Sequence, residues 1–134
     1  MRFPSEIEEL AHKVITAHAA KGKKIVTAES CTGGLIGGAL TAIAGSSDVF
    51  ERGFTTYSYD AKSDVLGVLP DTIQTCGAVS IEVAEAMAAG ALEYSLADHA
   101  LAVTGIAGPG GGMPNKPVGL VYFGVKTKEG TGFH

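Results

Sequence analysis

The sequence has little of what would assign it to several large classes of protein. Its 134 residues include only two cysteines, Cys31 and Cys76, which are too few and too far apart for a disulfide framework or a zinc knuckle. No apolar run reaches the roughly 18 residues that cross a membrane, and residues 1–9 carry mixed charge instead of the basic start of a secretory signal. We therefore expect a soluble, cytoplasmic protein with reduced thiols and no membrane partner.

Basic side chains and metal-ligand spacings are also scarce. Ten Lys and Arg stand against fourteen Asp and Glu, a net charge of −4, and no basic stripe suited to a nucleic-acid duplex is present. The four histidines share no ligand spacing, and His12 and His18 fall on different faces of a helix. We therefore expect no nucleic-acid partner, no metal site and no cofactor.

Glycine is abundant, and its nineteen copies cluster between apolar runs. The length suits one compact domain over residues 1–134. Helical and strand-like patterns alternate, which predicts an α/β sheet covered on both faces. The expected elements are a helix over 5–20 opened by a capping box of Ser5 and Glu8, a strand over 24–28, a helix over 35–44, a strand over 50–59, a helical turn over 60–66, an irregular segment over 70–77, a helix over 81–96, a strand over 99–103, a glycine-rich loop over 104–112 and a strand over 118–125.

Three polar or glycine-rich segments, 29–34, 45–62 and 104–112, follow or flank predicted strands, where open α/β sheets form their ligand crevices. Segment 29–34 begins a helix, so its backbone amides could hold an anion, although helix capping by Ser30 or Thr32 is an equal alternative. Segment 104–112 lacks the Lys and Ser/Thr of a phosphate-binding loop and the GxGxxG spacing of dinucleotide binders. A surface loop explains it as well.

Residue chemistry alone leaves two candidate nucleophiles, Ser47 and Cys31. Ser47 follows a predicted helix, and Lys62 lies one strand further on, so the two side chains could meet at one sheet edge. A lysine with an ordinary pKa of about 10.4 acts as a base only when burial or a cation keeps it neutral. A capping serine and a solvated lysine remain the alternative. Cys31, with Glu29 and Lys62, could instead form a Cys-Glu-Lys set, or it could be a small buried side chain.

Six segments, taken together in their order and spacing along the chain, are more specific than any single glycine motif. They are TAESCTGG at 27–34, GSS at 45–47, GFTTYSYDAK at 53–62, GAVS at 77–80, VTGIAGPGGG at 103–112 and KPVG at 116–119. Together they resemble the CinA C-terminal-domain family over nearly the whole chain. The resemblance implies a three-layer α/β/α sandwich with a mixed, mainly parallel sheet of about four to five strands, and a homodimer.

The same resemblance implies an activity and a set of residues. The expected enzyme is an amidohydrolase of pyridine nucleotide salvage that converts nicotinamide mononucleotide to nicotinate mononucleotide and ammonia. A Ser/Lys dyad performs the reaction without metal or coenzyme. The implied residues are Ser47 and Lys62 for catalysis, Glu29, Ser30, Tyr57 and Thr104 for the polar pocket lining, and Thr32, Gly33 and Gly105 for backbone contacts with the substrate.

Two departures from the family pattern bear on function. Tyr59 stands where many relatives have asparagine, a change beside the expected pocket that predicts an altered substrate preference. Relatives usually continue beyond His134 through a strand, a Gly-Asp-Arg segment and a final helix, so the domain is expected to lack these and an arginine that would hold the substrate phosphate. This favours one alternative function, a non-catalytic nucleotide-binding regulatory module of a competence- or damage-inducible protein.

Overall fold

The computed structural model describes residues 2–129 and 131–133 and contains one mixed sheet of five strands in the order β2-β1-β3-β4-β5. β1 pairs in parallel with both β2 and β3, whereas β4 is antiparallel to β3 and β5 is antiparallel to β4. The elements in chain order are α1 (Ser5–Lys21), β1 (Ile25–Glu29), α2 (Leu35–Thr41), the 3₁₀ turn η1 (Ser46–Asp48), β2 (Phe50–Thr55), α3 (Tyr59–Leu66), α4 (Pro70–Cys76), α5 (Ile81–Glu93), β3 (His99–Gly105), β4 (Val121–Thr127) and β5 (Thr131–Phe133).

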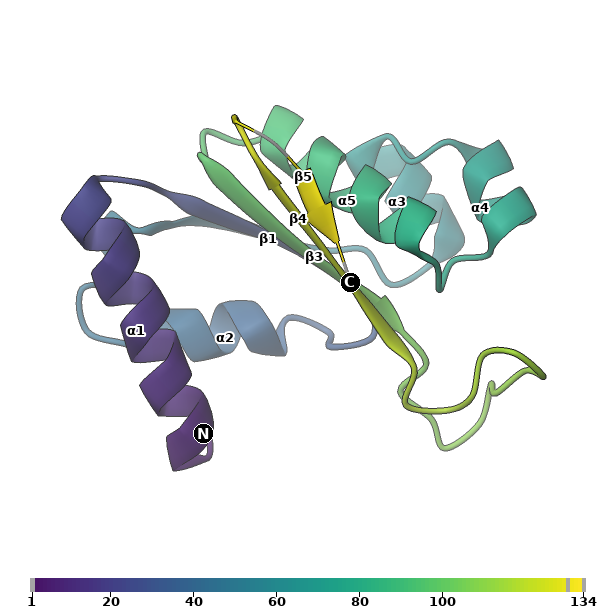
Figure 1. The fold of residues 1–134 in the computed structure, drawn as a ribbon, viewed down its shortest axis with the longest axis horizontal. Helices are drawn as coiled ribbons and strands as arrows, with labels where there is room; N and C mark the ends of the chain where they lie inside the picture. Colours follow the sequence, from purple (N-terminus) through teal and green to yellow (C-terminus); the bar gives the residue numbers. More distant parts are fainter. Residues whose placement is uncertain (1, 130, 134) are drawn as a thin grey trace.

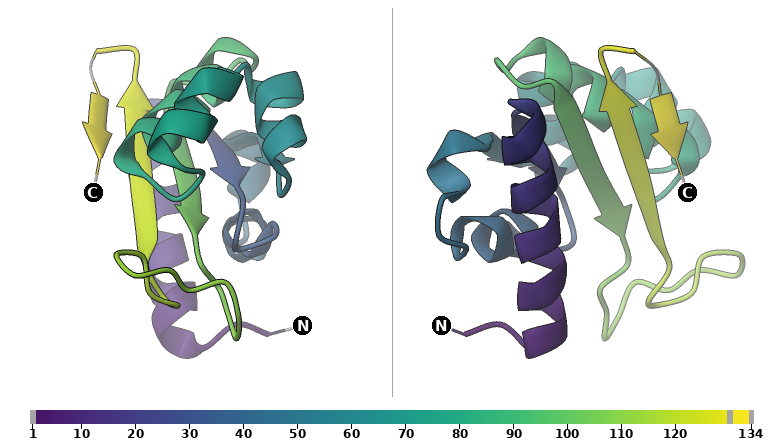
Figure 2. Two further views of the ribbon diagram at one scale, coloured as in Figure 1. Left: turned by 90° about the vertical axis from the view of Figure 1, so that its right-hand side faces the viewer. Right: turned by 60° about the vertical axis from the view of Figure 1, so that its left-hand side comes forward.

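Helices cover both faces of this sheet. α1 and α2 lie on one face, while α3, α4 and α5 lie on the other (Figures 1 and 2). Side chains of β1 alternate between two cores, with Ile25 packed toward α1 and α2 and with Val26 and Ala28 packed beside α5. The three-layer α/β/α architecture with a mixed sheet is thus confirmed. None of the helices in the described part has the length and apolarity that a membrane crossing requires.

α5 is built from small residues because it packs unusually close to its neighbours. A Cβ added at Gly90 would lie 1.9 Å from the carbonyl oxygen of Leu66 at the end of α3. A Cβ added at Gly124 of β4 would lie 2.4 Å from the carbonyl oxygen of Ala84 in α5. At its other end, α5 starts beside the carboxyl end of β3, since Thr104 Oγ1 donates to the carbonyl of Ala78 just before the helix.

Two helix starts differ from the prediction. The capping box of Ser5 and Glu8 is wrong, because Pro4 is the N-cap of α1 and no side chain caps it. The carbonyl of Pro4 instead accepts hydrogen bonds from the amides of Ile7 and Glu8, at 3.0 Å each. Residues 70–77 were expected to be irregular, but Pro70 begins α4, a position where the fixed φ of proline favours a helix.

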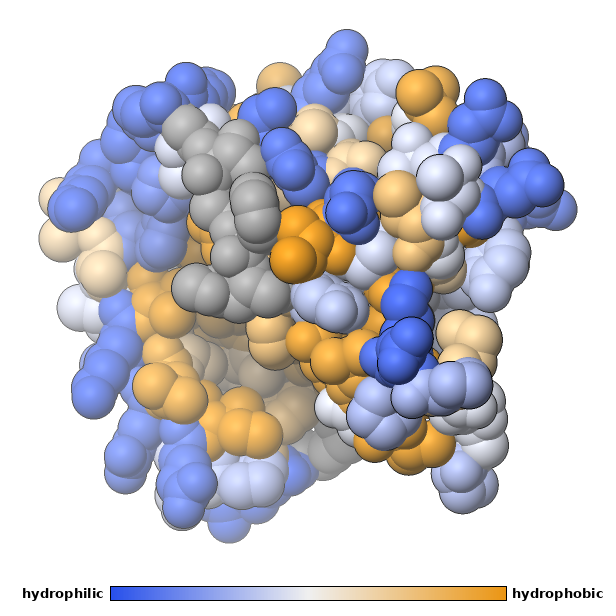
Figure 3. All heavy atoms as spheres, turned by 45° about the vertical axis from the view of Figure 1, so that its right-hand side comes forward, coloured by the Kyte–Doolittle hydropathy of each residue, from blue (hydrophilic) through white to orange (hydrophobic). Residues whose placement is uncertain are grey.

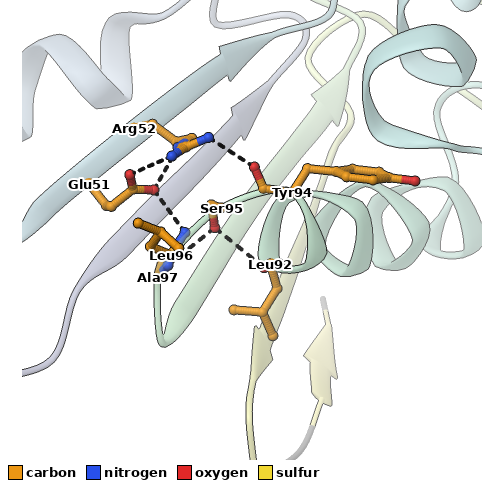
Figure 4. A network of polar contacts seen from close by, with 7 residues as sticks. All are labelled: Glu51, Arg52, Leu92, Tyr94, Ser95, Leu96 and Ala97. Carbon is orange, nitrogen blue, oxygen red and sulfur yellow. Dashed lines mark hydrogen bonds and ion pairs between the residues drawn. The ribbon is translucent and has the colours of Figure 1, made fainter.

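A surface network fixes β2 at the edge of the sheet (Figure 4). Glu51 and Arg52 of β2 form an ion pair at 2.7 Å. Arg52 Nη1 donates to the carbonyl of Tyr94, and the amide of Leu96 donates to Glu51 Oε2, both at 3.1 Å. An exposed ion pair contributes little by itself. Its two links to the α5–β3 connection hold the start of β2 in register.

Candidate active site

Polar segments converge where the three parallel strands end, because parallel strands direct their carboxyl ends to the same sheet edge. Ser30 follows β1, Thr56 and Tyr57 follow β2, and Thr104 lies at the end of β3. These segments border a cavity of about 260 Å³. Its lining residues are Ser30, Cys31, Tyr57, Tyr59, Lys62, Ala78, Val79, Thr104, Gly105, Ile106, Ala107, Gly108, Gly110 and Gly111.

Lys62 is a buried amine that lines this cavity. It extends from α3, is only 1% exposed, and forms no ion pair among the described residues. Its Nζ lies 2.8 Å from Ser30 Oγ and donates to the carbonyl oxygens of Thr56 and Tyr57 at 3.0 and 3.1 Å. Burial lowers the pKa of Lys62 below its ordinary value of 10.5, while the charge of Cys31 has a smaller effect in the opposite direction. A larger fraction of this amine is therefore neutral than in a solvated lysine.

Ser30 is held by its own backbone. Its amide donates to the carbonyl of Val103 at 2.9 Å, and its carbonyl accepts from the amide of Gly33 at 3.1 Å. Gly33 and Gly34 have φ values of +62° and +103°, which side-chain-bearing residues rarely adopt, so they permit the tight turn into α2. The hydroxyl is thereby fixed at the end of a fully buried strand, facing Lys62.

The structure does not bring Ser47 to Lys62, which corrects the predicted pairing. Ser47 is exposed on η1, and the amide of Ile25, at the start of β1, donates to the carbonyl of Val49 just after η1. Because β1 and β2 are parallel, a segment before β2 lies at the edge where β1 begins, whereas Lys62 follows β2 and lies where β1 ends. The length of β1, roughly 15 Å, separates the two. The serine that contacts Lys62 is Ser30.

The alternative Cys-Glu-Lys set is assembled only in part, because Cys31 and Lys62 line the same cavity but Glu29 does not. The buried carboxylate of Glu29 accepts hydrogen bonds from the amides of Ile36 and Gly37, at 2.9 Å each, and from Thr32 Oγ1. These contacts cap the start of α2 and direct the carboxylate to α2. Cys31 does line the cavity, but burial is the largest effect on its thiol and raises its pKa, which disfavours the thiolate.

Comparisons with known proteins show the family to which the chain belongs. Residues 7–134 match the family model described as the CinA C-terminal domain. The chain belongs to this family. Among solved structures, the competence/damage inducible protein CihA from Agrobacterium tumefaciens superposes with a TM-score of 0.97 at 57% identity, covering 100% of this chain and 82% of that one.

Two curated relatives of the family have different names and lengths. The nicotinamide-nucleotide amidohydrolase PncC of Escherichia coli K12 is 49% identical over 128 residues, which cover 96% of this chain and 78% of PncC. A putative competence-damage inducible protein of Caldicellulosiruptor saccharolyticus is 54% identical over 122 residues. That match covers 91% of this chain but only 30% of the Caldicellulosiruptor protein.

Of the remaining residues implied by the family resemblance, some line the cavity and others do not. Thr104 Oγ1 donates to the carbonyl of Ala78 at 2.7 Å, and Tyr57 lines the rim. At Gly105 an added Cβ would lie 2.7 Å from the carbonyl oxygen of Leu120, so only glycine fits there. Thr32 and Gly33 do not line this cavity, and Thr32 instead bonds to Glu29.

Sequence reasoning did not assign a role to three contributors to the site. Thr56 supplies a carbonyl to Lys62, and Ala78 and Val79 form the wall at the start of α5. The only signal for the wall was the GAVS segment, where Ser80 caps α5 by accepting from the amide of Val83 at 3.2 Å. The carbonyl of Thr56 carries no sequence signal, because any residue has one.

A larger apolar groove of about 930 Å³ lies on the other face of the sheet. Side chains of α1, α2, β3 and β4 line it, and Figure 3 shows apolar side chains gathered around a hollow. Its titratable members are His18 and His99, whose rings are joined by a 2.8 Å contact between Nε2 and Nδ1. Because neither Ser30 nor Lys62 reaches this groove, the dyad geometry belongs to the smaller cavity.

Proposed function

We propose that the chain is an amidohydrolase that converts nicotinamide mononucleotide to nicotinate mononucleotide and ammonia, with Ser30 as nucleophile and Lys62 as base. The observation that carries the proposal is the 2.8 Å contact between Ser30 Oγ and a buried lysine whose pKa is lowered. A serine within hydrogen-bond reach of a neutral amine is the arrangement that Ser/Lys hydrolases need. The amidohydrolase PncC, 49% identical over 96% of this chain, supports the choice of substrate.

The reaction follows from these two side chains. Neutral Lys62 takes the proton of Ser30 as Oγ attacks the carboxamide carbon, and the protonated lysine then gives that proton to the departing nitrogen. Ammonia leaves, and an ester joins Ser30 to the nicotinoyl carbon. Lys62 next removes a proton from water, which attacks the ester and releases nicotinate mononucleotide. The proton returns to Ser30, so both groups end in their starting states.

The test is ammonia release by four purified proteins. We expect Ser30→Ala to lose about 10³-fold or more of kcat, because no other group replaces the nucleophile. Ser47→Ala should stay within about 2-fold of the wild type, since Ser47 lies at the opposite sheet edge. Cys31→Ala should retain most activity. Full activity in Ser30→Ala would overturn the dyad, and selective loss in Cys31→Ala would favour a thiol mechanism.

A second candidate is a nucleotide-binding regulatory module without turnover. It is favoured by one observation, that the matched region forms only 30% of the Caldicellulosiruptor relative with a competence-damage name. Calorimetric binding of the mononucleotide without ammonia release by the wild type would support the module, whereas turnover would exclude it. The homodimer and the role in pyridine nucleotide salvage stay predictions, and sedimentation measurements test the first.

A further inference from the structure

We propose that Tyr59 selects the positively charged pyridinium ring of the substrate through the face of its phenol ring. The inference rests on the proposed function, because it assigns the recognition of one part of that substrate. Tyr59 is the first residue of α3, immediately after the N-cap Ser58, and it lines the cavity that holds Ser30 and Lys62.

The charges around the cavity create the need for such a residue. The ring nitrogen of nicotinamide mononucleotide carries a positive charge, yet no residue among the described lining set is Asp or Glu. The ionisable amine in the cavity, Lys62, would repel the ring when protonated. A cationic ring beside Lys62 also lowers the pKa of the amine further, so substrate binding and loss of the lysine proton favour each other.

Two aromatic side chains at this site can attract a cation. Tyr57 and Tyr59 are 69% and 64% exposed, although both line the cavity. Neither phenol hydroxyl has a hydrogen-bond partner among the described residues, so both rings are available to a ligand. The electron-rich face of a tyrosine attracts a cation that lies within about 6 Å of its centre.

The two tyrosines have different attachments, and this singles out Tyr59 for specificity. The backbone carbonyl of Tyr57 accepts a hydrogen bond from Lys62, so a substitution that shifts the backbone at Tyr57 also moves an acceptor of the amine. Tyr59 lines the same cavity, but the hydrogen bonds of Lys62 Nζ within the described residues go to Ser30, Thr56 and Tyr57 and not to Tyr59. The cavity of about 260 Å³ is below the roughly 300 Å³ of the smaller drug-sized pockets, so it accommodates the reacting ring rather than the whole nucleotide.

The experiment compares two ligands that differ in ring charge. Nicotinamide mononucleotide has a cationic ring, and its reduced form has a neutral dihydropyridine ring with the same ribose phosphate. Dissociation constants are measured by calorimetry for Tyr59→Leu and Tyr59→Phe in a Ser30→Ala background, which prevents turnover. Ammonia release is measured in parallel with Ser30 intact.

We expect Tyr59→Leu to weaken binding of the cationic nucleotide by about 5- to 30-fold and binding of the reduced nucleotide by less than about 2-fold. Tyr59→Phe, which keeps an aromatic face, should restore most of the selectivity. Equal weakening of both ligands, or no change in either, would overturn the inference. Absence of ammonia release by the wild type would reject the proposed function, while a charge-selective loss of binding in the same proteins would still support the role of Tyr59.

Discussion

Lys62→Met is the substitution that tests whether the buried amine is neutral in the folded protein. Methionine has a similar length and lacks ionisable protons, so it removes the base while it keeps most of the packing on α3. The carbonyls of Thr56 and Tyr57 lose a donor, which costs about 1–3 kcal/mol for each acceptor that stays buried and unpaired. That cost does not change with pH, whereas the ionisation of Lys62 does.

The sign of the pH effect follows from where each state releases its proton. The folded-state pKa of Lys62 lies below the ordinary value of 10.5 because the side chain is buried. Between these two pKa values the unfolded chain holds a proton that the folded chain has lost, so the free energy of unfolding rises with pH. One such proton gives a slope of at most about 1.4 kcal/mol per pH unit. Below the folded pKa, or above 10.5, the two states hold equal numbers of protons and the slope vanishes.

Urea unfolding of the wild type and Lys62→Met between pH 6 and pH 10.5 provides the measurement. We expect the stability of the wild type to rise relative to that of the variant as pH increases through this range. Ammonia release by the variant should fall by about 10²-fold or more, because general base catalysis is lost. A difference in stability that stays constant up to pH 10.5 would mean that Lys62 keeps its proton on folding, and the mechanism would then lose its base.

Three further predictions concern packing, capping and histidine. Gly90→Ala should lower the free energy of unfolding by about 3 kcal/mol, because its Cβ would overlap the carbonyl of Leu66, while Gly110→Ala should stay within about 0.5 kcal/mol. Glu29→Ala should cost about 2–4 kcal/mol in urea unfolding, since it leaves α2 amides unpaired, and Glu29→Gln should cost less. Burial and, to a smaller extent, the charge of His18 lower the pKa of His99 below 6.5. The free energy of unfolding should therefore fall as the pH drops below 6.5, because the unfolded chain takes up the proton first. In a series of unfolding measurements over pH, His99→Gln should show a smaller fall. The packing argument would be refuted if Gly110→Ala lost as much stability as Gly90→Ala, and the capping argument if Glu29→Gln lost as much as Glu29→Ala. The histidine argument would be refuted if His99→Gln lost as much stability below pH 6.5 as the wild type.

Much of the fold was predictable because local patterns and tertiary packing agree. The buried run at 24–28 became β1, the alanine-rich segment with the Ser80 cap became α5, and the apolar run from His99 became β3. α4 was missed because Pro70 and Gly77 were treated only as breaks, although proline also begins helices. Ser5 was mistaken for a cap because the sequence does not show that the Pro4 carbonyl already accepts the first amides.

The candidate site was predictable in part of its membership but not in its pairing. Ser30, Lys62 and Thr104 were all expected near one pocket, and the structure brings them together. Ser47 was assigned as the nucleophile from the family resemblance, and its expected contact with Lys62 assumed that the segments before and after β2 lie at one sheet edge. The parallel pairing of β1 and β2, which no short segment of sequence encodes, puts the two flanks at opposite edges.

In the proposed mechanism, burial of Lys62 serves catalysis, while the same burial opposes stability. A buried amine with no ion pair loses hydration, and three oxygen acceptors, Ser30 Oγ and the carbonyls of Thr56 and Tyr57, offset that loss only in part. Solvent exposure of the same amine would restore its ordinary pKa and leave it protonated near neutral pH. If the dyad operates as proposed, the close packing of α5 at Gly90 against the end of α3 matters for function, because a shift of α3 would move Lys62 away from Ser30. Gly90→Ala should for this reason lower kcat in the fraction of protein that remains folded.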